Sequence, residues 1–286
     1  MSDHERATKS SHAPASGRLR QSFQAGTAAP LGYHVVLRLS DDRVIAPTPG
    51  ELRIAACTLI ERGRPHRLLG CSVADTHAHA VLLCSRAAAG QFAGRGASAL
   101  RYAMRLAVPF EPASIRPIRD QRHLANAFDY VLRQEQRHGI ARDGFHEGSN
   151  LPDLVGLRVV GHDCAKLLRQ YLPRTSQASL LRKFDVDWAT PVAFDPRLLL
   201  DAALATFGMT SLSGRAPATI AARATAIAAA GKQMSADELA SLFGIDVRTV
   251  FRMRATPRDP KAVRAVQLQL QLRALLRSSP GQPNGQ

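Results

Sequence analysis

Two short apolar segments, 66–73 and 77–84, are separated by only three residues, Ala74-Asp75-Thr76. Each segment has the length and composition of a β-strand, and so short a connection joins antiparallel neighbours. This hairpin constrains the rest of the fold, because the elements around it have to extend a sheet that already contains two adjacent antiparallel strands.

The segments around the hairpin predict strands and helices in a regular order. We expect a strand at 33–39, a helix from Thr48 to Gly63, a helix at 89–107, a short strand at 115–118 and a helix at 121–138. Thr48 is the expected N-cap, with proline in the first turn. The order β-α-β-β-α-β-α predicts an α+β domain, a ferredoxin-like antiparallel sheet with helices packed on it.

The remaining segments divide the chain further. Residues 1–30 are rich in Ser, Ala, Gly and charge and are predicted to be a disordered basic tail. Residues 31–146 form the predicted α+β domain, and 147–194 read as an irregular connector that wraps this domain. The pattern from 195 to 278 predicts an all-helical domain, followed by a second disordered tail at 279–286.

Charge points to a nucleic-acid partner. The 286 residues carry a formal net charge of +15, an excess that favours a polyanion, nucleic acid before an anionic membrane. No apolar run approaches the roughly 18 residues that span a bilayer, and no secretory signal is present. The four cysteines form no CxxC pair, which argues against a zinc site or a disulfide framework. We therefore expect a cytoplasmic, nucleoid-associated protein.

A pair of histidines opens the second strand of the hairpin, in the stretch DTHAHAVLL. On a strand, residues i and i+2 face the same side, so His77 and His79 point together while Ala78 and Ala80 point to the other face. Two neutral imidazoles aimed at one point are half of a site for a divalent metal ion. The alternative is two polar side chains on a solvated strand face.

The helix predicted at 121–138 carries a second candidate pair. Tyr130 and Gln134 are four residues apart and therefore lie on one face of the helix. Taken alone, this pair is also typical of a surface tyrosine beside a solvated glutamine. Its meaning depends on the histidines that precede it.

Together, the HxH strand motif, the helical Tyr-x-x-x-Gln and the basic chain resemble the single-tyrosine HUH transposases of simple insertion sequences and their REP-associated relatives. The resemblance covers residues 32–145, including the strand YHVVLR and the segment AFDYVLRQEQRHGI. It implies that His77, His79 and Gln134 bind Mg²⁺ or Mn²⁺ and that Tyr130 is the nucleophile. The implied activity is cleavage and transfer of single-stranded or hairpin DNA through a 5′-phosphotyrosine, by a homodimer. Whether the tyrosine serves its own subunit or the partner stays open.

A second DNA-binding pattern lies at 235–255, SADELASLFGIDVRTVFRMRA, which fits a helix-turn-helix. Ala240 is the small residue where two helices cross, Gly244 is the turn and Asp246 caps the second helix. The expected buried positions are Leu239, Phe243, Ile245, Val250 and Met253. The candidate DNA-binding residues on the second helix are Arg248, Thr249, Arg252 and Arg254.

This region resembles the DNA-binding modules of replication initiators and simple repressors. Residues 248–277 hold eight Arg or Lys and one Asp, which favours contact with phosphates. The alternative is an ordinary helical hairpin within a bundle.

Two functions follow from these patterns. The first is a metal-dependent single-stranded DNA endonuclease and strand transferase with an additional anchor on duplex DNA. The second is a domesticated, non-catalytic relative that regulates transcription or repeats through its C-terminal module. An RNA-binding module is less favoured, because the strands carry no aromatic stacking pair.

Overall fold

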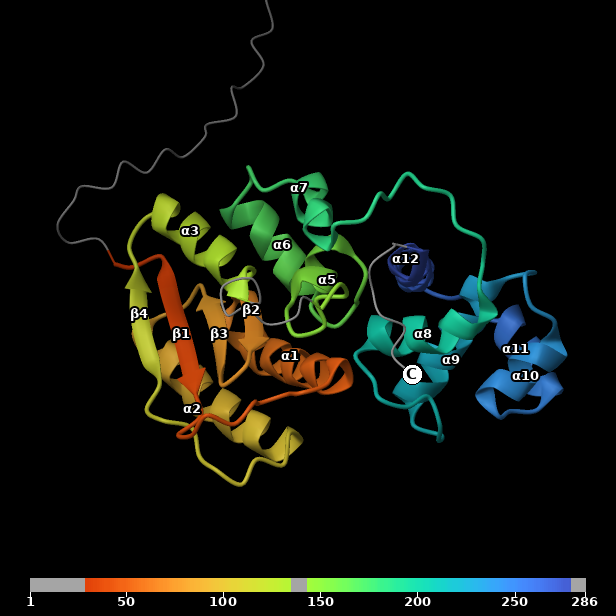
Figure 1. Cartoon of the computed structure of the whole chain (residues 1–286), viewed down its shortest axis with the longest axis horizontal. Coiled ribbons are helices and arrows are strands. Elements are labelled where there is room, and N and C mark those ends of the chain that lie inside the picture. The colour runs from red at the N-terminus through yellow and green to blue at the C-terminus, as the bar shows by residue number, and fades with distance from the viewer. Residues whose placement is uncertain (1–28, 135–142, 279–286) are drawn as a thin grey trace, which may run out of the picture.

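The computed structural model describes residues 29–134 and 143–278. The N-terminal part is a mixed α+β structure built on an antiparallel sheet, and the C-terminal part is helical (Figure 1). The predicted tails at 1–30 and 279–286 lie outside the described residues, except for 29 and 30. Within the described part of the chain, no helix is long and apolar enough to cross a membrane.

The sheet has four strands in the order β2-β3-β1-β4, and every adjacent pair is antiparallel. The strands are β1 (Gly32–Arg38), β2 (Leu68–Ala74), β3 (His77–Leu82) and β4 (Ser114–Ile118). The predicted hairpin of β2 and β3 is confirmed, and it turns at Asp75, whose φ is 53°. In the register of the sheet, His79 lies opposite Val36 of β1 and Ser72 of β2.

Two helices cover the apolar face of the sheet, α1 (Pro49–Gly63) and α2 (Arg86–Ala103). The start of α1 is as predicted, because Thr48 accepts a hydrogen bond from the backbone N–H of Glu51 and the Glu51 carboxylate accepts one from the backbone N–H of Thr48. Buried side chains on this face include Val35, Leu37, Cys71, Val73, Ala78 and Ala80. The two alanines between and after the histidines therefore pack into the core.

The opposite face is covered by α3 (Gln121–Val131), which approaches the sheet closely where β2 has a glycine. A Cβ at Gly70 would lie 3.0 Å from Cδ2 of Phe128, so the ring would have to shift slightly to admit a larger residue. α3 ends at Val131, residues 132–133 form a turn, and Gln134 is helical again; the rest of the predicted helix, 135–138, lies outside the described residues. At this turn the carbonyl of Tyr130 accepts from the backbone N–H of Arg133 and from the side-chain amide of Gln134.

The segment 147–194 packs on the N-terminal part, as expected of a connector that wraps it, but it is more regular than predicted. It contains three short helices, α5 (Leu151–Val155), α6 (His162–Tyr171) and α7 (Gln177–Leu181), and residues from each are buried in the same core as the sheet. Residues 148–150 run along the outer edge of β2, where the side chain of Asn150 bonds the backbone of Leu69 and Cys71. Helices this short leave only a weak periodic signal.

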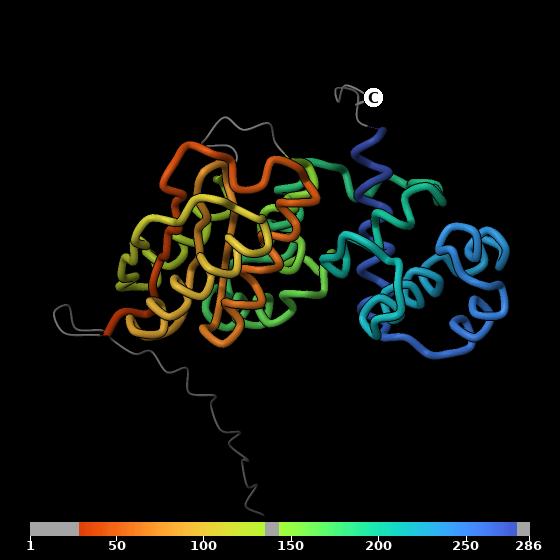
Figure 2. Tube along the Cα trace, turned by 90° about the horizontal axis from the view of Figure 1, so that it is seen from below, coloured from red at the N-terminus to blue at the C-terminus, as the bar shows by residue number. Residues whose placement is uncertain are grey.

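The described residues from 196 to 278 form helices joined by short connections, as predicted. The helices are α8 (Leu199–Phe207), α9 (Pro217–Ala230), α10 (Ala236–Phe243), α11 (Val247–Ala255) and α12 (Pro260–Ser278), preceded by a 3₁₀ turn at Pro196–Leu198. They enclose a second hydrophobic core. Figure 2 shows α12, in dark blue, beside the sheet-containing part, with α10 and α11 on its far side.

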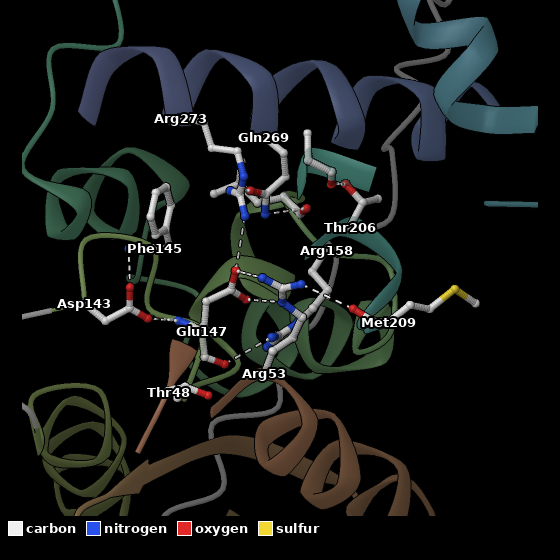
Figure 3. Close-up of polar contacts among 12 residues, drawn as sticks. Thr48, Arg53, Asp143, Phe145, Glu147, Arg158, Thr206, Met209, Gln269 and Arg273 are labelled. Carbon is white, nitrogen blue, oxygen red and sulfur yellow. Dashed lines mark hydrogen bonds and ion pairs between the residues drawn. The ribbon is translucent and has the colours of Figure 1, made fainter. Parts of the chain in front are cut away.

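Helix α12 belongs to both cores. Val266 and Leu270 pack in the C-terminal core, and Leu272 packs in the N-terminal core. The polar side of this junction is centred on Glu147, whose carboxylate accepts hydrogen bonds from Arg53 of α1 and Arg273 of α12 (Figure 3). All three side chains are buried, so the junction is a dry ion-pair cluster.

Candidate active site

The two histidines of β3 lie on the sheet face that α3 covers. The rings of His77 and His79 are 6% and 3% exposed, with centroids 4.7 Å apart and planes at 81°. Burial excludes the alternative of two polar residues on a solvated strand face. Burying an imidazole is unfavourable unless its ring nitrogens have polar partners, so the surrounding interior has to supply such partners.

A third histidine, His34 of β1, completes this cluster. Its ring is stacked on that of His79, with centroids 5.2 Å apart and planes at 19°. Nε2 of His34 lies 3.0 Å from Nδ1 of His79, within hydrogen-bonding distance. Burial, with smaller contributions from the charges of Arg116 and His123, lowers the pKa of His34 from 6.5 to about 4. His34 is therefore neutral at neutral pH.

The side chain of Tyr130 reaches the same cluster from α3. Its ring meets that of His79 edge to face at a centroid distance of 5.5 Å, and that of His34 at 5.7 Å. The tyrosine is half-buried, so one side of it is open to solvent. The structure thus places the phenol beside the histidine pair within a single chain.

Gln134 follows Tyr130 across the turn that ends α3 and is 1% exposed. Its side-chain nitrogen donates to the carbonyl of Tyr130 at 2.9 Å, while its buried Oε1 accepts no hydrogen bond from the described residues. Burying a hydrogen-bond acceptor without a donor lowers the stability of a fold by about 1–3 kcal/mol, and a bound cation or a donor would offset this loss. Within the described residues, no group of three or more His, Cys, Asp or Glu is arranged to hold a metal ion.

Arginines border the open side of the cluster. Arg38 lies opposite His77 in the register and is exposed, and Arg116 of β4 lies opposite His34 and is also exposed. Alternation along the strands places both side chains on the face of the histidines. Arg101 does not border the cluster, because it belongs to α2 on the other face of the sheet. Its guanidinium donates to the carbonyls of Leu106 and Ala107.

A separate basic surface lies on α11, in the C-terminal part. Gly244, with φ of 59°, turns the chain between α10 and α11, and Asp246 caps α11 by accepting from the N–H of Arg248. The predicted interior positions are buried at Leu239, Ala240, Phe243, Val250 and Met253, and Ile245 is partly buried. Arg248 and Arg252 are exposed and Thr249 is partly exposed.

Two residues of α11 differ from expectation. The guanidinium of Arg254 donates to the carbonyls of Gly231 and Met234 at 3.1 and 2.7 Å, so it fastens α11 to the end of α9. Phe251 was not singled out from the sequence, yet its ring is 58% exposed beside the arginines. Its position, one helical turn from Arg248 and next to Arg252, is the signal that could have found it.

The structure therefore brings His77, His79 and Tyr130 together and adds His34 of β1. The strand register explains why His34 joins them. Val36 is the partner of His79, and His34 is two residues from Val36, so His34 and His79 lie on the same face of the sheet. Gln134 is fastened to Tyr130 through the backbone carbonyl. No protein-family model, curated protein or solved structure matches this chain.

Proposed function

We propose that this protein is a metal-dependent single-stranded DNA endonuclease and strand transferase of the single-tyrosine HUH type. The observation that carries the proposal is the contact of a half-buried tyrosine with a buried histidine pair. The ring centroids of Tyr130 and His79 are 5.5 Å apart, and those of His79 and His77 are 4.7 Å apart. In the proposed reaction the histidines belong to a metal site and the tyrosine is the nucleophile.

The donor atoms fit a hard divalent cation. His77, His79 and Gln134 would hold it, and the buried Oε1 of Gln134, which accepts no bond from the described residues, is the observation that favours a cation over a purely structural cluster. When bound, Mg²⁺ or Mn²⁺ supplies Lewis-acid polarisation of a non-bridging phosphate oxygen and stabilises the charge that develops there.

The proposed chemistry of Tyr130 is a transesterification. Its Oη attacks the phosphorus, a tyrosine–phosphate bond forms, and the bond from phosphorus to the 3′ oxygen breaks. The phenol proton passes to solvent, and the leaving oxygen takes up a proton to become a 3′-OH. A phenol with a pKa near 10 is a poor nucleophile, so positive charge at the site is needed to favour the phenolate. The product, a 5′-phosphotyrosine, retains the bond energy for strand transfer without ATP.

The exposed arginines support a nucleic-acid substrate at this site. Arg38 and Arg116 lie on the same sheet face as the histidines, at opposite ends of the cluster. A strand whose scissile phosphate reaches Tyr130 would place neighbouring phosphates near these two side chains. Single-stranded DNA fits better than a duplex because one strand has to bend into a partly buried site.

The architecture supports the same proposal. The element order β-α-β-β-α-β and the strand order β2-β3-β1-β4 favour a ferredoxin-like fold for the N-terminal part. In the C-terminal part, α10 and α11 would act as a helix-turn-helix that anchors the enzyme on duplex DNA through Arg248, Thr249 and Arg252. The alternative function, a non-catalytic DNA-binding regulator, rests on this second surface alone.

A covalent-trapping experiment tests the proposal. The full chain is incubated with Mn²⁺ and labelled single strands, including hairpins from its own genomic neighbourhood, and analysed on a denaturing gel. We expect a protein–DNA adduct that is lost in Tyr130→Phe and kept in Tyr102→Phe, a matched control at a tyrosine that is 89% exposed on α2. If no strand gives an adduct while duplex DNA is still bound, the regulator is the better description.

A further inference from the structure

We infer that His34 is a positioning residue that fixes the tautomer and the orientation of His79 in the proposed metal site. The inference rests on the proposed function, because it assigns a role to His34 only if His79 is a ligand. The residues that the resemblance supplies do not include His34. It is the geometry of the cluster that brings it in.

Three contacts of His34 carry the argument. Its Nε2 lies 3.0 Å from Nδ1 of His79, and the two rings are stacked at 5.2 Å with nearly parallel planes. Its ring also meets Tyr130 at 5.7 Å. One side chain therefore touches both the candidate ligand and the candidate nucleophile, from the strand next to the one that carries the ligand.

Proton accounting gives the direction of the hydrogen bond. A neutral imidazole carries one N–H, and the nitrogen that binds a metal ion has to be the other one. His79 presents Nδ1 to His34, so in the proposed site Nδ1 carries the proton and the other ring nitrogen, Nε2, would be the metal-binding atom. His34 then has to accept through Nε2 and carry its own proton on Nδ1.

The geometry agrees with this accepting role. The strand register places Arg116 of β4 opposite His34, while Nε2 of His34 lies 3.0 Å from Nδ1 of His79. An imidazole that accepts a hydrogen bond through Nε2 has to be neutral. An acceptor beside a ligand histidine raises the basicity of that ligand and holds the ring in place, a task that a carboxylate or a carbonyl performs in many metal sites.

Two substitutions separate this role from simple packing. His34→Phe keeps an aromatic ring against His79 and Tyr130 but removes the acceptor. His34→Gln removes the ring but keeps an acceptor of similar reach. His123→Gln is the matched control, since His123 is exposed and its Nδ1 accepts only from the backbone N–H of Arg119.

The first measurement is the affinity for Mn²⁺ alone, by calorimetry on the full chain. We expect His34→Phe to bind Mn²⁺ about 10–100-fold more weakly, in the range seen for loss of an outer hydrogen-bond partner, with His34→Gln closer to wild type and His123→Gln unchanged. The second is the tautomer of His79 in metal-free protein, from long-range ¹H–¹⁵N spectra of the imidazoles. We expect the proton on Nδ1 in wild type and in His34→Gln, and its redistribution in His34→Phe.

The outcomes are distinguishable. Equal Mn²⁺ affinity in wild type and His34→Phe, or a wild-type His79 protonated on Nε2, overturns the role of His34 and leaves the proposed activity standing. A wild-type protein that binds no Mn²⁺ overturns the metal site itself and the role of His34 with it. Circular dichroism of each variant establishes that folded protein is being compared.

Discussion

Tyr130 meets His79 edge to face at 5.5 Å, and both residues belong to one chain. The helix that carries the tyrosine is fastened to its own sheet, because Phe128 packs over Gly70 and Asp129 pairs with Lys183 at 3.0 Å. The tyrosine therefore lies beside the histidines of its own chain.

The first prediction is therefore that the nucleophile acts in cis. A mixture of Tyr130→Phe with a His77→Ala, His79→Ala double variant should form no covalent DNA adduct, because neither chain contains both halves of a site. The measurement is the denaturing gel described above, after co-expression so that mixed dimers can form. The control is wild type co-expressed with each variant, which should retain adduct. Restored adduct in the mixture of variants would show that the tyrosine serves the partner.

The second prediction concerns pH and His34. Its pKa is about 4 in the folded protein against an ordinary value of 6.5, so between these values the unfolded chain binds more protons. The contribution of His34 to the free energy of unfolding should increase as the pH rises from about 4 to 6.5. Above pH 6.5 this contribution should be fully present, at up to about 3 kcal/mol. Urea unfolding at several pH values in EDTA measures this. His34→Gln should flatten that part of the curve, and an unchanged pH profile would contradict the assignment.

The sheet and the histidine pair were predictable because the signals for a strand lie in residues that are close together in the sequence. The hairpin follows from two apolar runs and a short turn, and the common direction of His77 and His79 follows from alternation. His34 was not predictable in the same way, since its partner depends on the register between β1 and β3, which involves residues far apart in the sequence. The turn after Val131 was not predicted either, because the apolar residues before it have helical spacing and no glycine or proline marks it.

The junction at Glu147 was equally hidden, since its partners Arg53 and Arg273 lie in α1 and α12, at opposite ends of the chain. Each of these side chains alone is an ordinary charged residue in a basic sequence. Only the docking of α12 against the N-terminal part makes them a buried cluster. Leu272 of α12 lies in the same core as residues of the segment 147–194.

The third prediction is that Glu147 holds the two parts of the chain together. Glu147→Ala leaves two buried arginines without their counter-charge, which should lower the free energy of unfolding by about 3–5 kcal/mol. Urea unfolding monitored at Trp188, which packs against the N-terminal core, measures the loss. The control is Asp41→Asn, which breaks an exposed pair with Arg43 and should cost less than about 1 kcal/mol. Equal effects of the two substitutions would contradict the buried role of Glu147.

The fourth prediction separates the arginines of α11. Arg248→Ala with Arg252→Ala should weaken duplex binding and lower the slope of its salt dependence by about two, because two exposed phosphate contacts are lost. Arg254→Ala should mainly lower stability, since its guanidinium bonds the end of α9. Fluorescence anisotropy across a salt series and thermal unfolding give the two readouts. The control is Arg215→Ala, an exposed arginine outside α11. Unchanged binding in the double variant would remove α11 from the DNA contact.

The fifth prediction assigns the exposed ring of Phe251 to base readout. An apolar side chain 58% exposed between Arg248 and Arg252 adds little to folding, but on a helix in the major groove it could contact the methyl group of thymine. Burying one methyl group is worth about 0.8 kcal/mol, or about four-fold in affinity.

The readout compares thymine with uracil, which differ by that methyl group alone. Duplexes are first selected from random sequence with wild-type protein, and each thymine is then replaced by uracil. We expect one or two positions at which wild type loses about four-fold in affinity and Phe251→Ala loses nothing. Ile220→Ala, at a residue 39% exposed on α9, should behave as wild type. If Phe251→Ala and wild type respond alike to uracil at every position, the ring does not read thymine. A uniform loss of affinity in Phe251→Ala would instead assign it to backbone contact, because a backbone contact is insensitive to the methyl group.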